Sequence, residues 1–180
     1  GAILDSDHML VTRGIKLYAD GALGSRGAAL LSKYEDYETK GLLIFKKKEI
    51  IPILIKALEQ GIQIQTHAIG DRGNRVTLDW YKEAFKKISP DQRKIAKPRW
   101  RVEHAQIISK EDQLRYKEMD LIASMQPSHA IGDLHFAPSR LGMDRVSDGY
   151  VWRNLIDLGV LIAGGSDAPV EIGDPRIEFY

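Results

Sequence analysis

The chain has 180 residues, which is enough to bury one core, so we expect a single domain over residues 1–180. Its 26 Lys and Arg residues nearly balance 25 Asp and Glu residues, and this charge balance predicts no nucleic-acid partner. The absence of cysteine excludes disulfides, thiolate metal sites and a cysteine nucleophile.

The first half of the chain alternates strand-like and helix-like segments. A strand is predicted at Gly14–Ala19, and a long glycine-rich segment follows from Asp20 to about Lys40. Apolar residues at helical spacing predict a helix at Lys48–Gln60. A second strand is predicted at Ile62–His67, and a helix with one apolar stripe is predicted at Asn74–Ile88.

The second half continues this alternation. A strand is predicted within Lys97–Gln106, and a capping-box pattern predicts a short helix from Ser109 to about Met119. A strand at Leu121–Gln126, a helix at Ser147–Leu158 and a last strand at Val160–Gly164 follow. Five strands separated by helix-like segments favour an α/β fold built from parallel βαβ units.

The two longest predicted loops, Asp20–Lys40 and Ala130–Val146, both follow strands, whereas the connections from helix to strand are short. In a (β/α)₈ barrel the loops after the strands form the active face, and the loops before the strands close the bottom. The sequence therefore predicts that function lies at the carboxyl ends of the strands.

Three of the predicted strands run into residues that can bind a metal, which are His67, His104 and Asp167. Lys16 lies on the polar face of the first strand, where a lysine is costly unless it is paired or modified. Imidazole and carboxylate suit Zn²⁺ and related ions, and such an ion lowers the pKa of its water towards ~7. The pattern predicts a metal-dependent hydrolase in which Asp167 moves the proton.

Each of these residues has a structural alternative when it is taken alone. His67 could be a hydrogen-bonded core histidine, and His104 could form an ion pair with Glu103. Asp167 could cap the segment after its strand, and Lys16 could form a salt bridge inside the barrel. The recurrence of ligand-type residues at strand ends weighs against four independent structural roles.

Four further residues are candidates for roles near the site or on the surface. Glu103 and Asp71 could hydrogen-bond to the histidine ligands from behind, or could make surface pairs instead. His135 lies in the long loop after the fourth strand and could reach the pocket. His8 precedes the first strand and is expected on the surface.

Five segments resemble a known family in the expected order along nearly the whole chain. They are Lys16–Ala28 (KLYADGALGSRGA), His67–Asp71 (HAIGD), Glu103–Gln106 (EHAQ), Ser124–Pro127 (SMQP) and Gly165–Glu171 (GSDAPVE). Together they resemble the amidohydrolase superfamily. Within it they are similar to amidohydrolase family 3, which includes N-substituted formamide deformylase-like proteins.

This resemblance implies a partial (β/α)₈ TIM-type barrel, of which the chain supplies strands 4 to 8. It implies that Lys16 is the strand-4 ligand, N-carboxylated so that it bridges two metals. His67 and His104 are then the ligands on strands 5 and 6, and Asp167 is both the strand-8 ligand and the catalytic general base. The implied cofactor is a divalent metal, with zinc expected.

The resemblance also implies a small-molecule substrate and the bond that is broken. Hydrolysis of a carbon–nitrogen bond in a non-peptide amide or a formamide is expected. Arg26, Gln126 and His129 are the residues expected to bind the substrate.

The sequence departs from the family pattern because it contains no His-x-His. We therefore expect an incomplete barrel domain, an excised piece of a longer hydrolase that lacks turnover alone. One alternative is an inactive fragment that self-associates through its open strand edges. Another is a mononuclear deaminase or lactonase of the same superfamily. No apolar run reaches the ~20 residues that cross a bilayer, so we expect no membrane partner and, by default, the cytoplasm.

Overall fold

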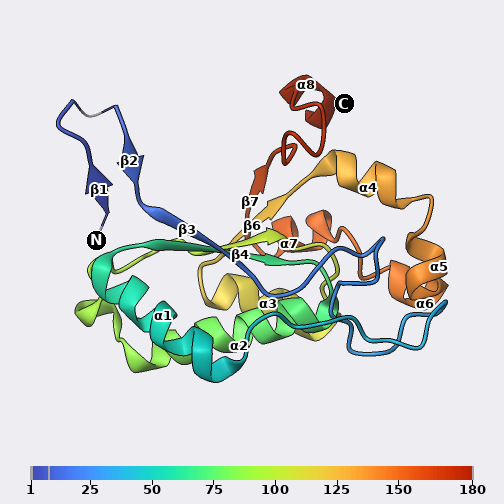
Figure 1. Cartoon of the computed structure of the whole chain (residues 1–180), viewed down its shortest axis with the longest axis horizontal. Coiled ribbons are helices and arrows are strands. Elements are labelled where there is room, and N and C mark those ends of the chain that lie inside the picture. The colour runs from blue at the N-terminus through green and yellow to red at the C-terminus, as the bar shows by residue number, and fades with distance from the viewer. Residues whose placement is uncertain (1, 8, 180) are drawn as a thin grey trace.

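The computed structural model describes residues 2–7 and 9–179, and its centre is one parallel β-sheet. Its five strands lie in chain order, each paired in parallel with the next (Figure 1). They are β3 (Gly14–Tyr18), β4 (Gln63–Ala68), β5 (Arg101–His104), β6 (Ile122–Met125) and β7 (Leu161–Gly164). Consecutive parallel strands with helices between them form an arc of a (β/α)₈ barrel. The predicted α/β partial barrel is confirmed.

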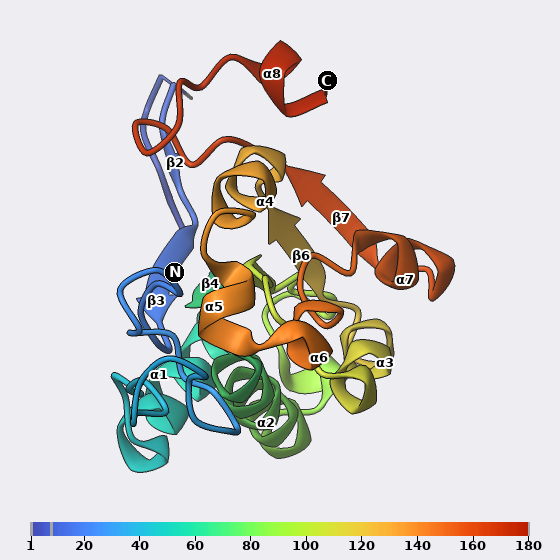
Figure 2. The same cartoon turned by 90° about the vertical axis from the view of Figure 1, so that its right-hand side faces the viewer.

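Three longer helices cover one face of this sheet. In Figure 1, α1 (Lys47–Gln60), α2 (Asp71–Lys87) and α3 (Lys110–Glu118) lie beneath the strands. Four short helices follow β6: α4 (Pro127–Asp133), α5 (Ala137–Leu141), α6 (Met143–Val146) and α7 (Trp152–Asp157). Figure 2 shows α7 beside β7. Across the described residues, no helix has the length and apolar character needed to span a bilayer.

The apolar core lies between the sheet and the helices because strand alternation directs one set of side chains towards them. Ile64 and Val102, from neighbouring strands, are fully buried in one cluster with Leu54 of α1 and Leu78 of α2. His67 lies at an alternate position of β4 and therefore faces away from this helical layer. One face of the sheet thus supplies the core and the other carries polar side chains.

The helix predicted at Ser147–Leu158 is wrong in its first half, because α7 is confined to the second half of that range. The preceding residues instead bond to the loop after β5. Gly149 pairs with Ile107 in an isolated bridge, and the Tyr150 N–H donates to the carbonyl of Gln106 at 2.7 Å. These long-range backbone bonds replace the helical ones.

Other boundaries also differ from the prediction. Much of the predicted loop Ala130–Val146 is helical, and α2 begins at Asp71, before the predicted Asn74. The elements that the sequence did not reveal are β1 (Ile3–Leu4), β2 (Val11–Thr12), the 3₁₀ turn η1 (Pro90–Gln92) and α8 (Pro175–Phe179). The β1–β2 hairpin projects from the body (Figure 1). The predicted surface position of His8 lies outside the described residues.

A buried asparagine joins the ends of β4 and β5 to two helices. Asn74, in the first turn of α2, is fully buried. Its Nδ2 donates to the carbonyls of Gly70, at 2.9 Å, and Ile107, at 3.0 Å. Its Oδ1 accepts a hydrogen bond from the Tyr116 hydroxyl of α3 at 2.5 Å. One amide therefore fixes the backbone that follows both strands.

We expect Tyr116→Phe to lower the free energy of unfolding of this chain by about 1–3 kcal/mol, because it leaves the buried Oδ1 of Asn74 without a donor. Urea denaturation followed by circular dichroism measures the change. The matched control is Tyr37→Phe, since Tyr37 is exposed, and its effect should stay within about 0.5 kcal/mol. Equal effects of the two variants would contradict the role given to Asn74.

Candidate functional site

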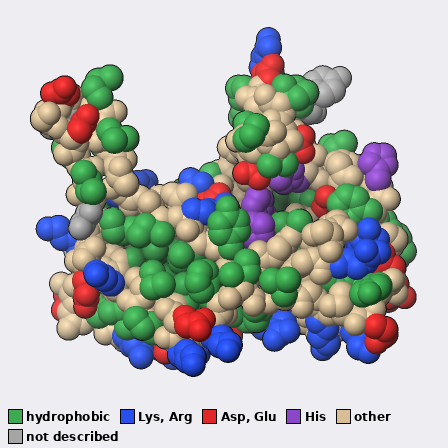
Figure 3. All heavy atoms as spheres, in the orientation of Figure 1, with side chains coloured by type: hydrophobic (Ala, Val, Ile, Leu, Met, Phe, Trp, Pro, Cys, Tyr) green, Lys and Arg blue, Asp and Glu red, His purple; other side chains and the backbone are tan. Residues whose placement is uncertain are grey.

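A cavity of about 530 Å³ opens at the carboxyl ends of the strands. In Figure 3, histidine side chains gather in a hollow next to the projecting C-terminal segment. Four residues predicted as metal ligands line this cavity: Lys16 from β3, His67 from β4, His104 from β5 and Asp167 after β7. The structure therefore brings together side chains that are up to 151 residues apart in the sequence (167 − 16).

The two histidines from β4 and β5 are in direct ring contact. The ring centroids of His67 and His104 are 4.5 Å apart, with an edge-to-face angle of 71°. Burial, followed by the charge of His104, lowers the pKa of His67 to about 4. Burial also lowers the pKa of His104. Both imidazoles are therefore neutral near pH 7, and each has a nitrogen lone pair available.

Gln126, which directly follows β6 and precedes α4, lies next to the His104 ring. Its Oε1 is 2.8 Å from Nδ1 of His104. Since an amide oxygen only accepts, Nδ1 carries the proton and the lone pair is on Nε2. Gln126 is buried and is not among the residues that line the cavity, so the geometry favours an orienting contact over direct contact with a substrate.

The backbone at two of the predicted ligands is strained. His104 has a φ of 71° and Asp167 has a φ of 58°, in the left-handed region that costs non-glycine residues energy. Lys16 has a conventional strand conformation, and its Nζ lies 5.1 Å from the centre of the Tyr18 ring. Strain of this kind concentrates at functional sites, where the surrounding structure holds it in place.

Asp20 is a buried carboxyl group close to His67 that is not among the site residues predicted from the sequence. It accepts backbone N–H bonds from Ile69 at 3.0 Å, Gly70 at 2.8 Å and Ala29 at 2.9 Å. Burial raises its pKa to about 7 against the effect of these three donors. Its Oδ1 lies 3.6 Å from Nε2 of His67, so burial favours a neutral pair at this contact.

These side chains are of the types that coordinate a divalent metal, but they do not form a complete ligand set by themselves. Neutral imidazoles bind zinc and related ions, and the Gln126 contact fixes the tautomer of His104 that leaves Nε2 available. Within the part of the chain that the structure describes, however, no group of three His, Asp or Glu side chains is close enough to hold a metal. The chain offers part of a ligand set at a common cavity.

The residues predicted to bind substrate are placed differently from one another. His129 of α4 lines the cavity, and its ring stacks on His104 with a centroid distance of 5.8 Å. Arg26 is not among the lining residues. Its guanidinium binds Asp36 through two hydrogen bonds, of 3.0 and 2.9 Å. A substrate role for either residue stays a prediction.

The residues expected to hydrogen-bond to the histidine ligands make other contacts in the structure. Glu103 forms an ion pair with Arg101 at 2.6 Å. It forms none with His104, so the structure does not support a Glu103–His104 ion pair as the role of His104. Asp71 accepts backbone N–H groups of Leu31 and Arg72, both at 2.8 Å. His135 is exposed and does not line the cavity.

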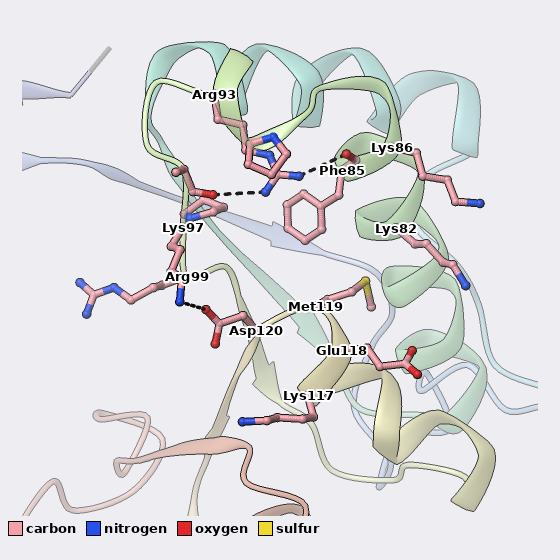
Figure 4. A pocket seen from close by; sticks show the side chains of 13 residues that line it. Lys82, Phe85, Lys86, Arg93, Lys97, Arg99, Lys117, Glu118, Met119 and Asp120 are labelled. Carbon is pink, nitrogen blue, oxygen red and sulfur yellow. Dashed lines mark hydrogen bonds and ion pairs between the residues drawn. The ribbon is translucent and has the colours of Figure 1, made fainter.

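A larger cavity of about 610 Å³ lies at the opposite end of the strands, before β5 and β6. Figure 4 shows its cationic side chains spread around Phe85, with Arg93 over the aromatic ring. Arg93 is engaged by three backbone carbonyls, and Lys97 forms an ion pair with Asp120. None of the described residues that line this cavity is a histidine, so it lacks the imidazole ligands of the first cavity.

Comparison with known proteins gives relatives over almost the whole chain. YtcJ of Bacillus subtilis is 35% identical over 164 residues, which cover 91% of this chain and 30% of YtcJ. Protein LONG AFTER FAR-RED 3 of Arabidopsis thaliana is 33% identical over 159 residues, 87% of this chain and 26% of the relative. The chain therefore spans less than a third of the length of either relative.

Two solved structures are similar in both fold and sequence. A metal-dependent hydrolase from Pyrococcus furiosus has a TM-score of 0.85 at 30% identity, over 99% of this chain and 35% of the other. A metal-dependent hydrolase from Pyrococcus horikoshii has a TM-score of 0.80 at 31% identity, over 93% and 32%. The amidohydrolase family model matches residues 3–180. By this match, the chain belongs to the amidohydrolase family.

Proposed function

We propose that this chain is part of a hydrolase that cleaves a carbon–nitrogen bond of a non-peptide amide or formamide, using water activated by a divalent metal, with zinc favoured. One observation carries the proposal, which is the convergence of Lys16, His67, His104 and Asp167 on one cavity at the strand ends. Membership of the amidohydrolase family and similarity to two metal-dependent hydrolases support it.

The histidines supply the most direct support for a metal. Neutral imidazole is the form that binds zinc, and the pKa of His67, lowered to about 4 by burial, keeps it in that form. Gln126 presents Nε2 of His104 to the metal by binding the other ring nitrogen. Lys16 would join the set as a carbamate, and residues outside this chain would supply the remaining ligands. A bound divalent ion makes water a nucleophile near pH 7.

Asp167 is the proposed proton carrier. It lines the cavity and belongs to the charges that act on His104. From this place its carboxylate can take a proton from the attacking water and deliver it to the departing nitrogen. The ring of His129 stacks on that of His104, and His129 is proposed to contact the substrate. Gln126 is proposed to orient the His104 ring through its hydrogen bond to Nδ1.

Two other functions are consistent with parts of the structure. A mononuclear deaminase or lactonase would use the same cavity, and a substrate panel separates these classes. The chain alone could also be an inactive barrel arc that self-associates, since among the described residues β3 and β7 each lack a strand neighbour on one side. A purified chain that is monomeric and turns over an amide would contradict this last alternative.

We expect Asp167→Asn, made in the complete barrel protein, to lower kcat for amide hydrolysis at least ~10²-fold, because general acid–base groups contribute ~10²–10⁴-fold. Asp174→Asn is the matched control, since Asp174 pairs with Arg176 outside the cavity, and its kcat should be unchanged. Metal content is measured for both variants. A metal-loaded Asp167→Asn enzyme with more than about a tenth of wild-type kcat would contradict the proposed role.

The neutral state of His67 gives a pH-dependent prediction for the metal-free chain. Its pKa is about 4 in the fold and about 6.5 in the unfolded chain, so the unfolded state takes up the proton first as the pH falls. His67 therefore destabilises the fold increasingly from pH 6.5 down to pH 4, by up to about 3 kcal/mol.

Comparison with His67→Gln isolates this effect, because the opposing contribution of Asp20, whose pKa is raised, is present in both proteins. Unfolding free energies from urea titrations at pH 7 and pH 4 should shift in favour of the variant by up to about 3 kcal/mol. A difference that does not change with pH would show that His67 is not held neutral.

A further inference from the structure

Asp133 is a carboxylate of the cavity that no step above uses. It is the last residue of α4 and lines the cavity wall, half-buried. Its Oδ2 accepts the Tyr150 hydroxyl at 2.6 Å and is also bonded by Nε2 of Gln106. Among the described residues, no donor is bonded to its Oδ1. One oxygen of this carboxylate is thus fixed and the other is free.

The network that holds Asp133 is costly to build. Gln106 is buried after β5, and its carbonyl accepts the N–H of Tyr150 at 2.7 Å. Tyr150 has a φ of 53°, in the left-handed region that a side chain of this size rarely adopts. Two segments far apart in sequence therefore bear strain and buried polar groups to fix one carboxylate at the cavity.

The charge of Asp133 is not balanced by a nearby lysine or arginine. Lys16, on β3, is the one Lys or Arg among the described residues that line the cavity. Arg26 and Arg140, on the adjoining loops, both bind Asp36 instead. Burial raises the pKa of Asp133, against the opposing effects of the Tyr150 and Gln106 hydrogen bonds and of the charge of His129, which is the one cationic neighbour in the described structure that acts on it. The carboxylate of Asp133 at the cavity wall therefore has no lysine or arginine partner within the described part of the chain.

Phe136 supplies an aromatic surface on the same wall. Its ring lies against Gly24, where an added Cβ would approach within 3.2 Å, and both residues line the cavity. A carboxylate only accepts hydrogen bonds, and it binds an ammonium group more strongly than a neutral donor. The Phe136 ring already carries the Arg140 guanidinium, 5.8 Å from its centre, so the ring supplies an apolar wall and the carboxylate supplies the attraction for an ammonium group.

We propose that Asp133 determines substrate specificity by binding a protonated amine on the part of the substrate remote from the bond that is cleaved. This inference rests on the proposed hydrolase function. The preferred substrates are then amides or formamides of diamines, with the free ammonium at Oδ1 of Asp133 and beside Phe136.

Asp133→Asn separates this role from a purely structural one. The asparagine oxygen can still accept from Tyr150 and Gln106, while its NH₂ group replaces the free acceptor by a donor. Asp144→Asn is the matched control, because Asp144 is exposed on the neighbouring helix α6 and does not line the cavity. Thermal unfolding of both variants verifies that the fold is retained.

The complete, metal-loaded protein is assayed with three N-formyl compounds of equal chain length, which end in an ammonium, a hydroxyl or a methyl group. We expect kcat/KM to favour the ammonium compound by ~10-fold or more in the wild type and in Asp144→Asn. In Asp133→Asn this preference should fall below about threefold, with activity on the methyl compound retained. If the compounds are hydrolysed, equal loss on all three substrates, or no wild-type preference for the ammonium compound, would overturn the proposal.

Calorimetric binding of the same compounds to the metal-free protein gives a second measurement that does not require turnover. Wild type should bind the ammonium compound more tightly than the methyl compound, and Asp133→Asn should not. If no amide is hydrolysed but this binding difference is observed, the proposed reaction is wrong and the role of Asp133 stands. If amides are hydrolysed without the binding difference, the role of Asp133 is wrong.

Discussion

The amide of Asn74 is the contact on which the geometry of the candidate site depends. It binds the carbonyls of Gly70 and Ile107, which follow the strands that carry His67 and His104. These carbonyls lie at the ends of parallel strands, where the sheet no longer supplies partners for them. By satisfying both from one side chain, α2 sets the distance between the two strand ends and hence between the two imidazoles.

Asp20 extends the same constraint to the loop after β3. Its carboxylate gathers backbone N–H groups from that loop and from the segment after β4, in contact with His67. Glycine is required nearby, because a Cβ at Gly73 would lie 2.3 Å from Oδ2 of Asp20. A Cβ at Gly70 would lie 2.0 Å from the carbonyl oxygen of Ala29. The loop and the strand ends are therefore packed backbone to backbone at the site.

The local sequence was sufficient for the strand–helix alternation and for the face on which His67 lies, because both follow from side-chain periodicity. Asp167 and His104 were recognisable because they follow apolar strands. The positions of Gln126 and Arg26 were not predictable from periodicity. One depends on a bond to His104 across the sheet and the other on a bond to Asp36 within an irregular loop. The start of α7 was missed because long-range backbone bonds replace local ones.

The proposed metal site is tested most directly by locating the metal in a crystal of the complete barrel protein by anomalous scattering at the zinc edge. We predict a zinc ion at about 2.0–2.1 Å from Nε2 of His104 and from a ring nitrogen of His67. Asp167 should lie at the same centre. Zinc bound only elsewhere, with these two imidazoles free in a protein that hydrolyses amides, would contradict a catalytic metal site at His67 and His104.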